Sequence, residues 1–485
     1  MRVARTAVLV AGLACMASLC LWNNCSKQSV DLAAAAVFKR MESRPFIPVL
    51  RRADKLAILE AVESRQPTLW RQSPVNDWAA MRLWTQASVL SKLIPWGLAR
   101  VQEGCEFVQS DPRRTSAPLL TRAREALPHR RRNVSVYDFF STEPQGAKTG
   151  RECVYMSGTI GSEQSMHWQT PRLLADMSPS DLLSLQDVPP LLRTEPWPPP
   201  PDSATLPQNQ TTRRLWLSGA GVVTRTHYDK GHTMLAQIVG RKLVLLWRPE
   251  QLHALRLYPA VHEAHRQSQL SFTSDQADLL ALTEKAGSAP AIVSLSPGDL
   301  LYIPPYFAHA VLALDSSATV AVVSESWEQA RWARSGWVPA PLGRAAGSRC
   351  RQARAAAALI SLFLRELCGR LSCTPTSLLL QLYNSRYLLL YGDIRQPLDG
   401  EFTLLAQCLQ TPSHEDALED GAWLQQLHVT GSAVADILVD ADETWQRRYD
   451  PSVAEQLAGD YVEEVAGWAC GADGVWRLLQ ALLGD

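Results

Sequence analysis

Between residues 213 and 327 the sequence consists of short apolar runs separated by glycine and proline. The runs are rich in Val, Ile, Leu and Trp, which favour strands; they read RRLWLSGAGVVTRTHYD, TMLAQIVGRKLVLLWRP, AIVSLSPGDLLYIPP and ATVAVVSESW. Val239-Gly240-Arg241 is typical of a hairpin, and the Pro-Gly-Asp at residues 297–299 of a turn before another strand. Several short antiparallel strands at this spacing predict a β-sandwich or barrel.

Helical patterns flank the β-rich region on both sides. Residues 32–64 place apolar side chains at three- and four-residue spacing. Beyond about residue 340, the segments RQARAAAALISLFLREL and TPTSLLLQLYNSRYLLLYG are again helical in pattern, and the second begins with Thr-Pro and ends with Gly. The sequence therefore predicts a mainly β core with flanking helices, followed by a helical C-terminal region over residues 340–485.

The N-terminus reads MRVARTAVLVAGLACMASLCLWNNC and has the form of a secretory signal. Arg2 and Arg5 precede an uncharged apolar run from Thr6 to Trp22, as in a basic n-region followed by an apolar core. A membrane span needs about 20 apolar residues, so residues 1–30 are predicted to be a signal peptide or an N-terminal membrane anchor. A buried first helix is the alternative. Either of the first two interpretations places the protein in the secretory pathway, lumenal or anchored as a type II membrane protein.

Cysteines and glycosylation motifs are compatible with that location without deciding it. Three of the ten cysteines lie in or beside the leader, and the other seven are scattered with no Cys-x-x-Cys pair. This spacing excludes a disulfide-dense scaffold and an ordinary zinc ribbon, and permits one or two disulfides. The tripeptides that begin at Asn24, Asn133 and Asn209 match the N-glycosylation pattern.

Charge is unevenly distributed along the chain. The formal net charge is zero, which argues against a protein that holds nucleic acid through its overall charge. Residues 415–485 contain fifteen acidic and three basic residues, so this segment carries −12 and the rest of the chain +12. The basic run from His129 to Arg132 is more typical of a solvated loop than of a phosphate-binding patch. We therefore do not expect nucleic acid as a partner.

A His-x-Asp motif stands at the end of one predicted strand. Side chains alternate along a strand, so His227 and Asp229 share a face and Tyr228 points to the other side. His309, which follows the strand DLLYIPP, is the candidate third ligand from a neighbouring strand. Two imidazoles and one carboxylate on one face of a metal leave coordination positions open, as in non-haem Fe(II) oxygenases. The alternative is an accidental motif and a structural histidine.

These residues belong to a longer pattern that resembles a known family. The segment THYDKGHTMLAQIVGRKLVLLWRPEQLHALRLYPAVHEAHRQSQLSF, followed by PGDLLYIPPYFAHAV, is similar to the JmjC/cupin-8 family of Fe(II)- and 2-oxoglutarate-dependent oxygenases. The most similar subgroup is that of the asparaginyl hydroxylase that inhibits hypoxia-inducible factor, with the small JmjC protein and tRNA hydroxylases. The resemblance covers residues 40–330 and implies a double-stranded β-helix, a cupin-like jelly roll, as the catalytic domain.

The resemblance also implies roles for individual residues. It assigns Fe(II) to the motif residues and the co-substrate 2-oxoglutarate to one lysine and two hydroxyl groups: His227, Asp229 and His309 for the metal, and Lys242, Thr224 and Tyr155 for 2-oxoglutarate. Only eight of the 48 basic residues are Lys, so a lysine at position 242 stands out where Arg is the usual cation. The sequence departs from the subgroup at Glu325, near which the subgroup has an Asn. That carboxylate either disturbs co-substrate binding or points outward.

The implied activity is that of a dioxygenase that uses Fe(II), 2-oxoglutarate and O₂ to hydroxylate a protein side chain. Demethylation of Lys or Arg and tRNA hydroxylation are alternatives within the family. A catalytically silent JmjC-like scaffold and a small-molecule cupin enzyme are the alternatives outside it. Only the oxygenases couple turnover of 2-oxoglutarate to iron and O₂, so that coupling distinguishes the two groups.

The C-terminal helices suggest a partner surface. In the resembled subgroup, helices after the barrel pair two protomers. Here one helix carries an apolar stripe and the next, over residues 375–391, is apolar on more than one face; the stripe consists of Leu359, Leu362, Phe363 and Leu367, and the second helix carries Leu378, Leu379, Leu382, Leu389 and Leu390. A homodimer is expected, with burial inside the protomer as the alternative. Membrane contact is expected only through the leader.

Overall fold

The structure is a computed structural model of the 485-residue chain. The residues that it describes are 47–52, 55–103, 105–109, 130–141, 152–161, 168–177, 212–271, 290–336, 338–345, 347–393, 407–409, 421–439 and 450–484. The chain divides into two compact units. The first takes residues 1–107, 128–247 and 271–326, and the second takes 108–127, 248–270 and 327–485.

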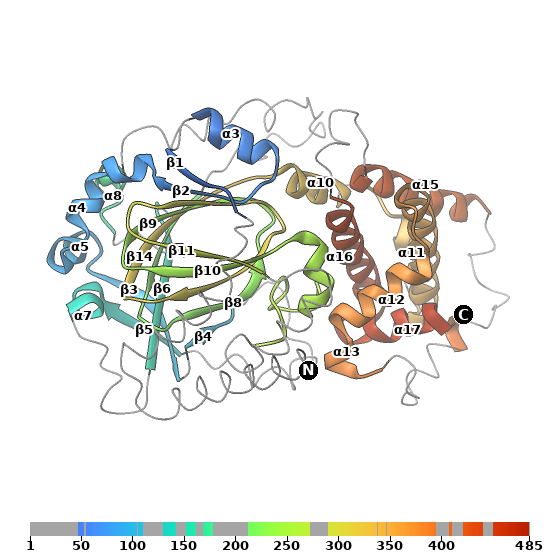
Figure 1. Cartoon of the computed structure of the whole chain (residues 1–485). Helices are drawn as coiled ribbons and strands as arrows, with labels where there is room; N and C mark the ends of the chain where they lie inside the picture. The colour runs from blue at the N-terminus through green and yellow to red at the C-terminus, as the bar shows by residue number, and fades with distance from the viewer. Residues whose placement is uncertain are drawn as a thin grey trace, which may run out of the picture. The chain divides into compact units, whose positions relative to one another are not determined.

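Two β-sheets form the first unit (Figure 1). In the part of the chain that the structure describes, nine strands form the larger sheet in the order β1 (Val49–Arg52), β2 (Thr68–Gln72), β12 (Leu300–Ile303), β9 (His232–Val239), β14 (Ser317–Ser324), β7 (Thr212–Ser218), β6 (Glu152–Thr159), β3 (Trp96–Glu103) and β5 (Arg130–Ser135). The smaller sheet has the order β11 (Ala291–Leu295), β10 (Lys242–Trp247), β13 (Ala308–Ala313), β8 (Val223–Tyr228) and β4 (Glu106–Phe107).

The two sheets pack against each other through their inner faces. Leu235 and Leu301 of the larger sheet lie in one apolar cluster with Val244, Leu246 and Val293 of the smaller sheet. Apart from β4, which lies parallel to β8, the strands of the smaller sheet pair antiparallel. The predicted mainly β, cupin-like jelly roll with flanking helices is confirmed.

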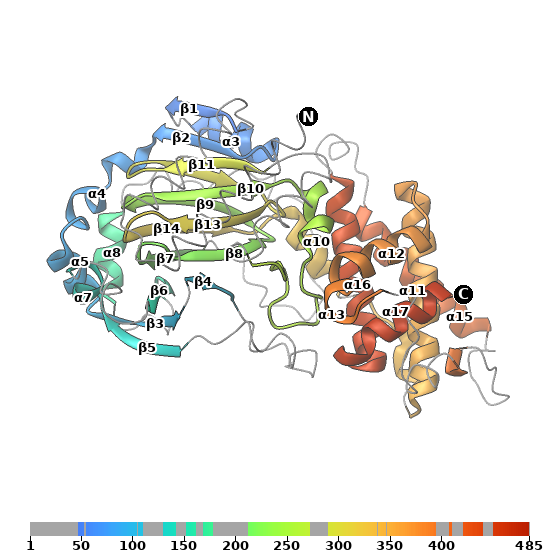
Figure 2. The ribbon, with the colours of Figure 1, turned by 60° about the horizontal axis from the view of Figure 1, so that its bottom comes forward.

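Helices cover the outer face of the larger sheet, as Figures 1 and 2 show. They are α3 (Lys55–Glu63), α4 (Ala79–Leu83), α5 (Ala87–Leu93), α7 (Val136–Ser141) and α8 (Thr170–Asp176). On β9, Met234 and Ala236 pack against this helical side while Leu235 points into the jelly roll. Because both faces of β9 are covered, its sequence reads as an almost continuous apolar run.

The hairpin predicted at Val239-Gly240-Arg241 is wrong, because this turn carries the chain from β9 in the larger sheet to β10 in the smaller sheet, and the two strands do not pair. Gly240 adopts φ 70°, a left-handed conformation that favours glycine. A Cβ at this position would also lie 2.5 Å from the carbonyl oxygen of Ser316. The Val-Gly-Arg signal therefore reflects both a backbone requirement and a close approach of two chain segments.

Helices dominate the second unit. Their bounds are α10 (Trp327–Ser335), α11 (Arg349–Leu371), α12 (Pro375–Arg386), α13 (Leu388–Tyr391), α15 (Gly421–Val439), α16 (Pro451–Cys470) and α17 (Val475–Gly484), with the 3-10 helix η7 at Pro249–Leu255. The hydroxyl of Thr374 accepts a hydrogen bond from the Ser377 backbone and caps α12, as its Thr-Pro start predicts. Residues 248–270, which the sequence analysis assigned to the β-rich region, belong to this unit.

Three of the four residues of the apolar stripe of α11 are buried inside the helical unit, and the fourth, Leu362, is half-buried. Leu359, Phe363 and Leu367 are each 0% exposed, and Phe363 contacts Tyr461 of α16 at a ring-centroid distance of 4.8 Å. This is the intramolecular alternative, so the stripe no longer argues for a dimer. Leu389 is 51% exposed. A homodimer stays a prediction.

Disulfides are more numerous than expected from the sequence. The described residues contain three, Cys105–Cys153, Cys350–Cys408 and Cys368–Cys373, where one or two were expected. Each pair becomes adjacent only after folding, except the last, whose members are 5 residues apart.

Among the described residues no helix is long and apolar enough to cross a membrane. The predicted leader, residues 1–30, lies outside the described residues.

Candidate metal centre

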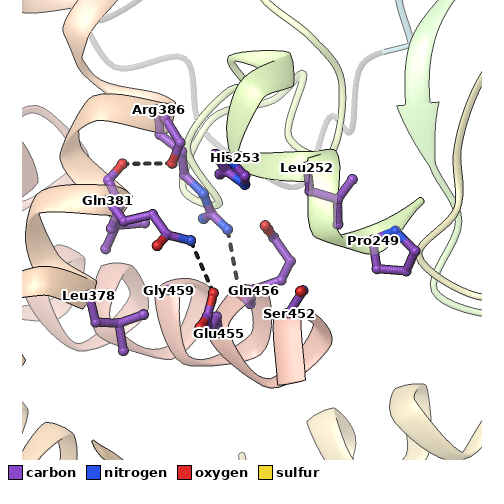
Figure 3. Close-up of a pocket in the computed structure, with 12 residues that line it drawn as sticks. Pro249, Leu252, His253, Leu378, Gln381, Arg386, Ser452, Glu455, Gln456 and Gly459 are labelled. Atoms are coloured by element: carbon purple, nitrogen blue, oxygen red, sulfur yellow. Dashed lines mark hydrogen bonds between the residues drawn. The ribbon is translucent and has the colours of Figure 1, made fainter. Parts of the chain in front are cut away.

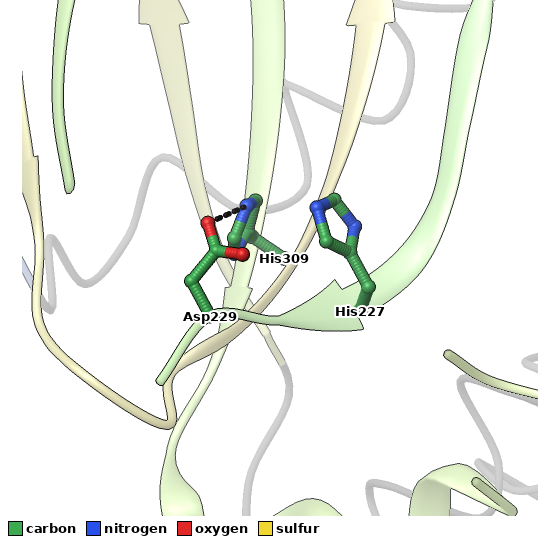
Figure 4. Close-up of side chains that lie close together, drawn as sticks. All are labelled: His227, Asp229 and His309. Carbon is green, nitrogen blue, oxygen red and sulfur yellow. Dashed lines mark ion pairs between the residues drawn. The ribbon is translucent and has the colours of Figure 1, made fainter. Parts of the chain in front are cut away.

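Two neighbouring strands bring the three motif residues together (Figure 4). His309 of β13 lies directly opposite His227 of β8, with a ring-centroid distance of 4.3 Å. Asp229 follows the end of β8, and its Oδ2 lies 3.9 Å from Nε2 of His309. One ligand atom from each of the three residues lies within 4.8 Å of the others. The two imidazoles and the carboxylate thus form a set of three possible metal ligands at the smaller sheet of the jelly roll.

Backbone carbonyls orient both imidazoles. Nδ1 of His227 lies 2.7 Å from the carbonyl oxygen of Arg225, and Nδ1 of His309 lies 3.1 Å from that of Phe307. A carbonyl can only accept, so each Nδ1 carries the proton and donates. Each Nε2 is then left with its lone pair, the form in which a histidine binds a metal. The hydroxyl of Thr233 donates to Asp229 Oδ2 at 3.3 Å. These contacts fit a metal site.

A β-bulge explains why Thr224 stands three residues before His227. On β13 the step from His309 to Val311 is two residues, but their partners on β8 are His227 and Thr224. The extra residue on β8 reverses the alternation, so Thr224 and His227 share a face. The Thr224 hydroxyl accepts a hydrogen bond from the backbone N–H of Val311 at 3.0 Å.

Lys242 lies on the inner face of β10. Lys242, Val244 and Leu246 pair with Ala313, Val311 and His309, so the lysine shares its face with a motif histidine. It is 5% exposed, and burial lowers its pKa to about 7. No nearby carboxylate contributes to that shift among the described residues. A buried ammonium without a carboxylate beside it fits a site that takes an anionic ligand.

The comparisons with known proteins cover the same region. The cupin-like domain family matches residues 55–327, which is more than half of the chain. The chain belongs to the cupin-like domain family. One similar relative is JmjC domain-containing protein D of Dictyostelium discoideum, 35% identical over 112 residues (22% of this chain, 23% of the relative).

Two further relatives are also similar to this chain. Jumonji C domain-containing protein 5 of Drosophila melanogaster is 25% identical over 275 residues, which is 55% of each chain. Lysine-specific demethylase 8 of Danio rerio is 32% identical over 116 residues, 23% of this chain and 27% of that protein. The matched segments span 55% or less of these three relatives.

Tyr155 lies inside this cupin-like domain, on β6. Its ring stacks on Trp216 at 5.4 Å and is tilted against Phe107 at 5.2 Å. Burial raises its pKa, and the guanidinium groups of Arg100 and Arg214 oppose that shift. Ala313, which pairs with Lys242, lies in the same apolar cluster as Tyr155. The structure thus brings Tyr155 to the Lys242 end of the domain.

Three features of the cupin-like domain were missed or left open by the sequence. The disulfide Cys105–Cys153 joins the chain before β4 to β6, in the apolar cluster of Tyr155. The spacing of the cysteines held no signal for this pair. His232 and Tyr302 form a buried hydrogen bond of 2.8 Å between β9 and β12. Glu325 follows the end of β14 and is exposed, which favours the outward alternative for its carboxylate.

A pocket in the helical unit contains none of the predicted site residues (Figure 3). It lies among η7, α12 and α16, and two of its polar side chains donate hydrogen bonds to other lining residues. Gln381 donates to Glu455 at 3.0 Å, and Arg386 donates to the backbone oxygen of Gln456 at 3.4 Å. The candidate site of the protein is therefore the donor set of the cupin-like domain.

Proposed function

We propose that the protein is an Fe(II)- and 2-oxoglutarate-dependent dioxygenase that hydroxylates a protein side chain. The observation that carries the proposal is the set of two imidazoles and one carboxylate within 4.8 Å of one another. Three protein ligands leave coordination positions free for a co-substrate and O₂. A structural zinc site would instead use four protein ligands.

The Lys242 side chain supports 2-oxoglutarate as the co-substrate. A dicarboxylate places one carboxylate at the metal and the other several ångströms away, where a compact buried cation can meet it. Lys242 is such a cation, and burial lowers its pKa to about 7. Tyr155 and Thr224 carry hydroxyl groups that suit the same carboxylate. This role for the three residues is part of the proposal.

In this scheme the protein residues hold the metal, orient its ligands and shield the reactive centre from water. His227, Asp229 and His309 bind Fe(II), which when bound supplies O₂ activation coupled to oxidative decarboxylation of 2-oxoglutarate. The carbonyls of Arg225 and Phe307 keep both imidazoles in the binding orientation. Apolar side chains such as Val244 and Leu246 line the interior and keep water from the reactive centre.

Demethylation is the second candidate, because relatives in the comparisons are named as lysine-specific demethylases. The disulfides favour hydroxylation of a secreted or lumenal protein instead. Disulfides persist in oxidising compartments, and the described residues contain three. They support the secretory location that the N-terminus predicts, where histones and tRNA are not the expected substrates. A silent scaffold would have no use for a buried lysine beside an intact donor set.

Anaerobic titration of the purified protein with Fe(II) and then 2-oxoglutarate tests the proposal. We expect a metal-to-ligand charge-transfer band that appears only with both, followed by succinate formation when O₂ is admitted. Asp229→Ala is the control and should show neither. A wild-type protein that binds Fe(II) without the band, or forms no succinate from 2-oxoglutarate, contradicts the proposal and favours a scaffold or another cupin chemistry.

The location has a separate test. Expression of the full chain in a secretory cell should yield protein whose mass falls on treatment with an N-glycosidase, through Asn133 or Asn209. Recovery of the full-length chain in the cytosol, unglycosylated, contradicts the secretory proposal and leaves the enzymatic one untouched.

A further inference from the structure

The larger sheet continues beyond the jelly roll through β6, β3 and β5, with β5 at its outer edge (Figure 2). One cross-strand row on this extension contains two arginines and the tyrosine of the candidate site. Arg100 on β3 lies opposite Arg131 on β5, and on its other side opposite Tyr155 on β6. Directly opposed residues on neighbouring strands point to the same face. The two arginines therefore share the face of Tyr155.

Burial along β3 shows which face this is. Gly97 and Ala99 are buried on the side of the covering helices, where Ala99 joins their apolar cluster. Trp96 and Leu98 alternate with them and are 38% and 53% exposed. Arg100 follows on the same side and is half-buried. Among the described residues, the face that carries Arg100 and Arg131 thus runs from the buried Tyr155 to the exposed Arg131 and includes two exposed apolar side chains.

A third guanidinium completes the group. Arg214 on β7 lies 4.8 Å above the ring of Trp216, and Trp216 stacks on Tyr155 at 5.4 Å. Burial lowers the pKa of Arg100, and the positive charges of Arg214 and Arg131 lower it further. Like charges that face one another on adjacent strands are unfavourable for folding. An anion bound among them would relieve that repulsion.

We propose that this basic surface, formed by Trp96, Leu98, Arg100, Arg131 and Arg214, binds acidic side chains of the protein substrate beside the metal centre. The inference rests on the proposed function and names its substrate class: a polypeptide with Asp or Glu near the modified residue. The co-substrate itself does not account for Arg131. Neighbouring strands lie about 4.8 Å apart, so the backbone of Arg131 is two strand spacings from Tyr155, with Arg100 between them. Arg131 is exposed, whereas Tyr155 is buried.

An acidic peptide fits the surface better than RNA. The whole chain has no net positive charge, whereas nucleic-acid affinity depends on many phosphate contacts. The exposed Trp96 and Leu98 suit apolar side chains of a polypeptide. Among the described strands β5 is the edge of the sheet, so its backbone can pair with an extended segment. Arginine is also the cation that meets carboxylates in a bidentate manner.

Fluorescence anisotropy of a labelled peptide tests this directly. The probe is a peptide of alternating Glu and Ala, and its partner peptide has Gln in place of Glu. We expect the full-length protein to bind the Glu peptide in a salt-sensitive manner and the Gln peptide much more weakly. Arg131→Glu should weaken Glu-peptide binding about tenfold or more, because a charge-assisted contact becomes a repulsion.

Arg132→Glu is the matched control. Arg132 is exposed on the same strand but lies opposite Ala99, on the other face of the sheet. The charge change is identical, so general electrostatics alters both variants equally. Under the proposal Arg132→Glu should change the peptide Kd by less than about twofold, since no contact is lost. Equal effects of the two substitutions overturn the proposal. Arg214→Gln, which retains the size of a polar side chain, should weaken binding in the same direction as Arg131→Glu.

Three further results would overturn it. One is a single-stranded RNA that displaces the Glu peptide and binds more tightly. Another is loss of 2-oxoglutarate affinity in Arg131→Glu, read from the charge-transfer band, with peptide binding unchanged. The third is a glycan on Asn133, which lies opposite Leu98 on this face, that blocks peptide binding until it is removed. If the wild type binds the Glu peptide but forms no succinate, the proposed function fails while the surface is upheld.

Discussion

The two units of the chain each bury a cation, and they treat it in opposite ways. In the helical unit, Arg386 is 3% exposed and donates to Asp460 at 2.8 Å and to Glu463 at 2.5 Å. Glu463 also accepts a hydrogen bond from the backbone of Ala260 at 2.5 Å. In the β-rich unit, Lys242 is equally buried, but no carboxylate of the described residues shifts its pKa.

The difference separates a structural charge from one kept for a ligand. Arg386 has its counter-charges within its own unit, so it holds α12, α16 and the 248–270 segment together. Lys242 raises the energy of the ligand-free protein, because a buried cation without a counter-charge is costly. Such a cost persists where function needs it. Removal of Arg386 should therefore destabilise the protein, whereas removal of Lys242 should stabilise its ligand-free form.

Loss of a metal ligand is the largest expected effect. His309→Ala or Asp229→Ala should abolish Fe(II) binding and 2-oxoglutarate decarboxylation, because two remaining ligands hold a labile ferrous ion poorly. Metal analysis after gel filtration and a succinate assay measure both. His253→Ala, an exposed histidine of the helical unit, should retain both properties. Stoichiometric iron with undiminished turnover in either ligand variant would refute the assignment.

Arg386→Ala should be strongly destabilising. It leaves Asp460 and Glu463 buried without their counter-charge, which costs about 3–5 kcal/mol in free energy of unfolding. Urea unfolding followed by circular dichroism measures the change. The control is Arg370→Ala, which breaks an exposed ion pair with Asp436 and should cost less than about 1 kcal/mol. If the two variants lose similar amounts of free energy of unfolding, the buried ion pairs of Arg386 stabilise the protein no more than an exposed pair does.

Lys242→Ala should weaken 2-oxoglutarate binding by about 2–5 kcal/mol and spare iron, because a buried charged hydrogen bond is lost. Lys242→Met should in addition stabilise the ligand-free protein, the opposite sign to Arg386→Ala. Titration of the charge-transfer band and urea unfolding give the two values. Lys92→Ala, an exposed lysine on α5, is the control. If the affinity for 2-oxoglutarate changes by less than a few-fold, another cation binds the carboxylate that lies away from the metal.

A smaller effect is expected from pH. The folded-state pKa of Lys242 is about 7 against an ordinary value of 10.5, so the unfolded chain binds more protons between these values. The destabilisation due to Lys242 is fully present below pH 7 and disappears as pH rises toward 10.5. Above pH 7, binding of 2-oxoglutarate must take up a proton, and affinity should fall by up to about tenfold per pH unit.

Calorimetry at pH 8 in buffers of different ionisation enthalpy measures that proton uptake. Lys242→Ala should show none. Equal uptake in the wild type and the variant would place the titrating group elsewhere and weaken the contrast between the two buried cations.

Much of the fold could be predicted because its signals are local. The left-handed turn at Gly240 and the cap at Thr374 depend on a few consecutive residues, and the structure contains both. The hairpin expected at Gly240 is wrong, because the strands on either side of the turn pair in different sheets. The cupin-like fold class was predicted and is confirmed. The disulfide count was underestimated, because pairs such as Cys105 and Cys153 meet only when β4 and β6 are in place. The α11 stripe was assigned to a dimer because apolar periodicity predicts burial without naming what covers it.

By itself the sequence predicted that His227 and Asp229 share a face, because strands alternate their side chains with a period of two that follows from backbone geometry. The bulge that puts Thr224 on the face of His227 breaks this period and came only from the structure. Only the tertiary structure decided which strands stand side by side: His227 opposite His309, and Arg131 opposite Arg100. Those pairings depend on the register of whole sheets, whose free energy is summed over many distant contacts. No local spacing of residues encodes that sum.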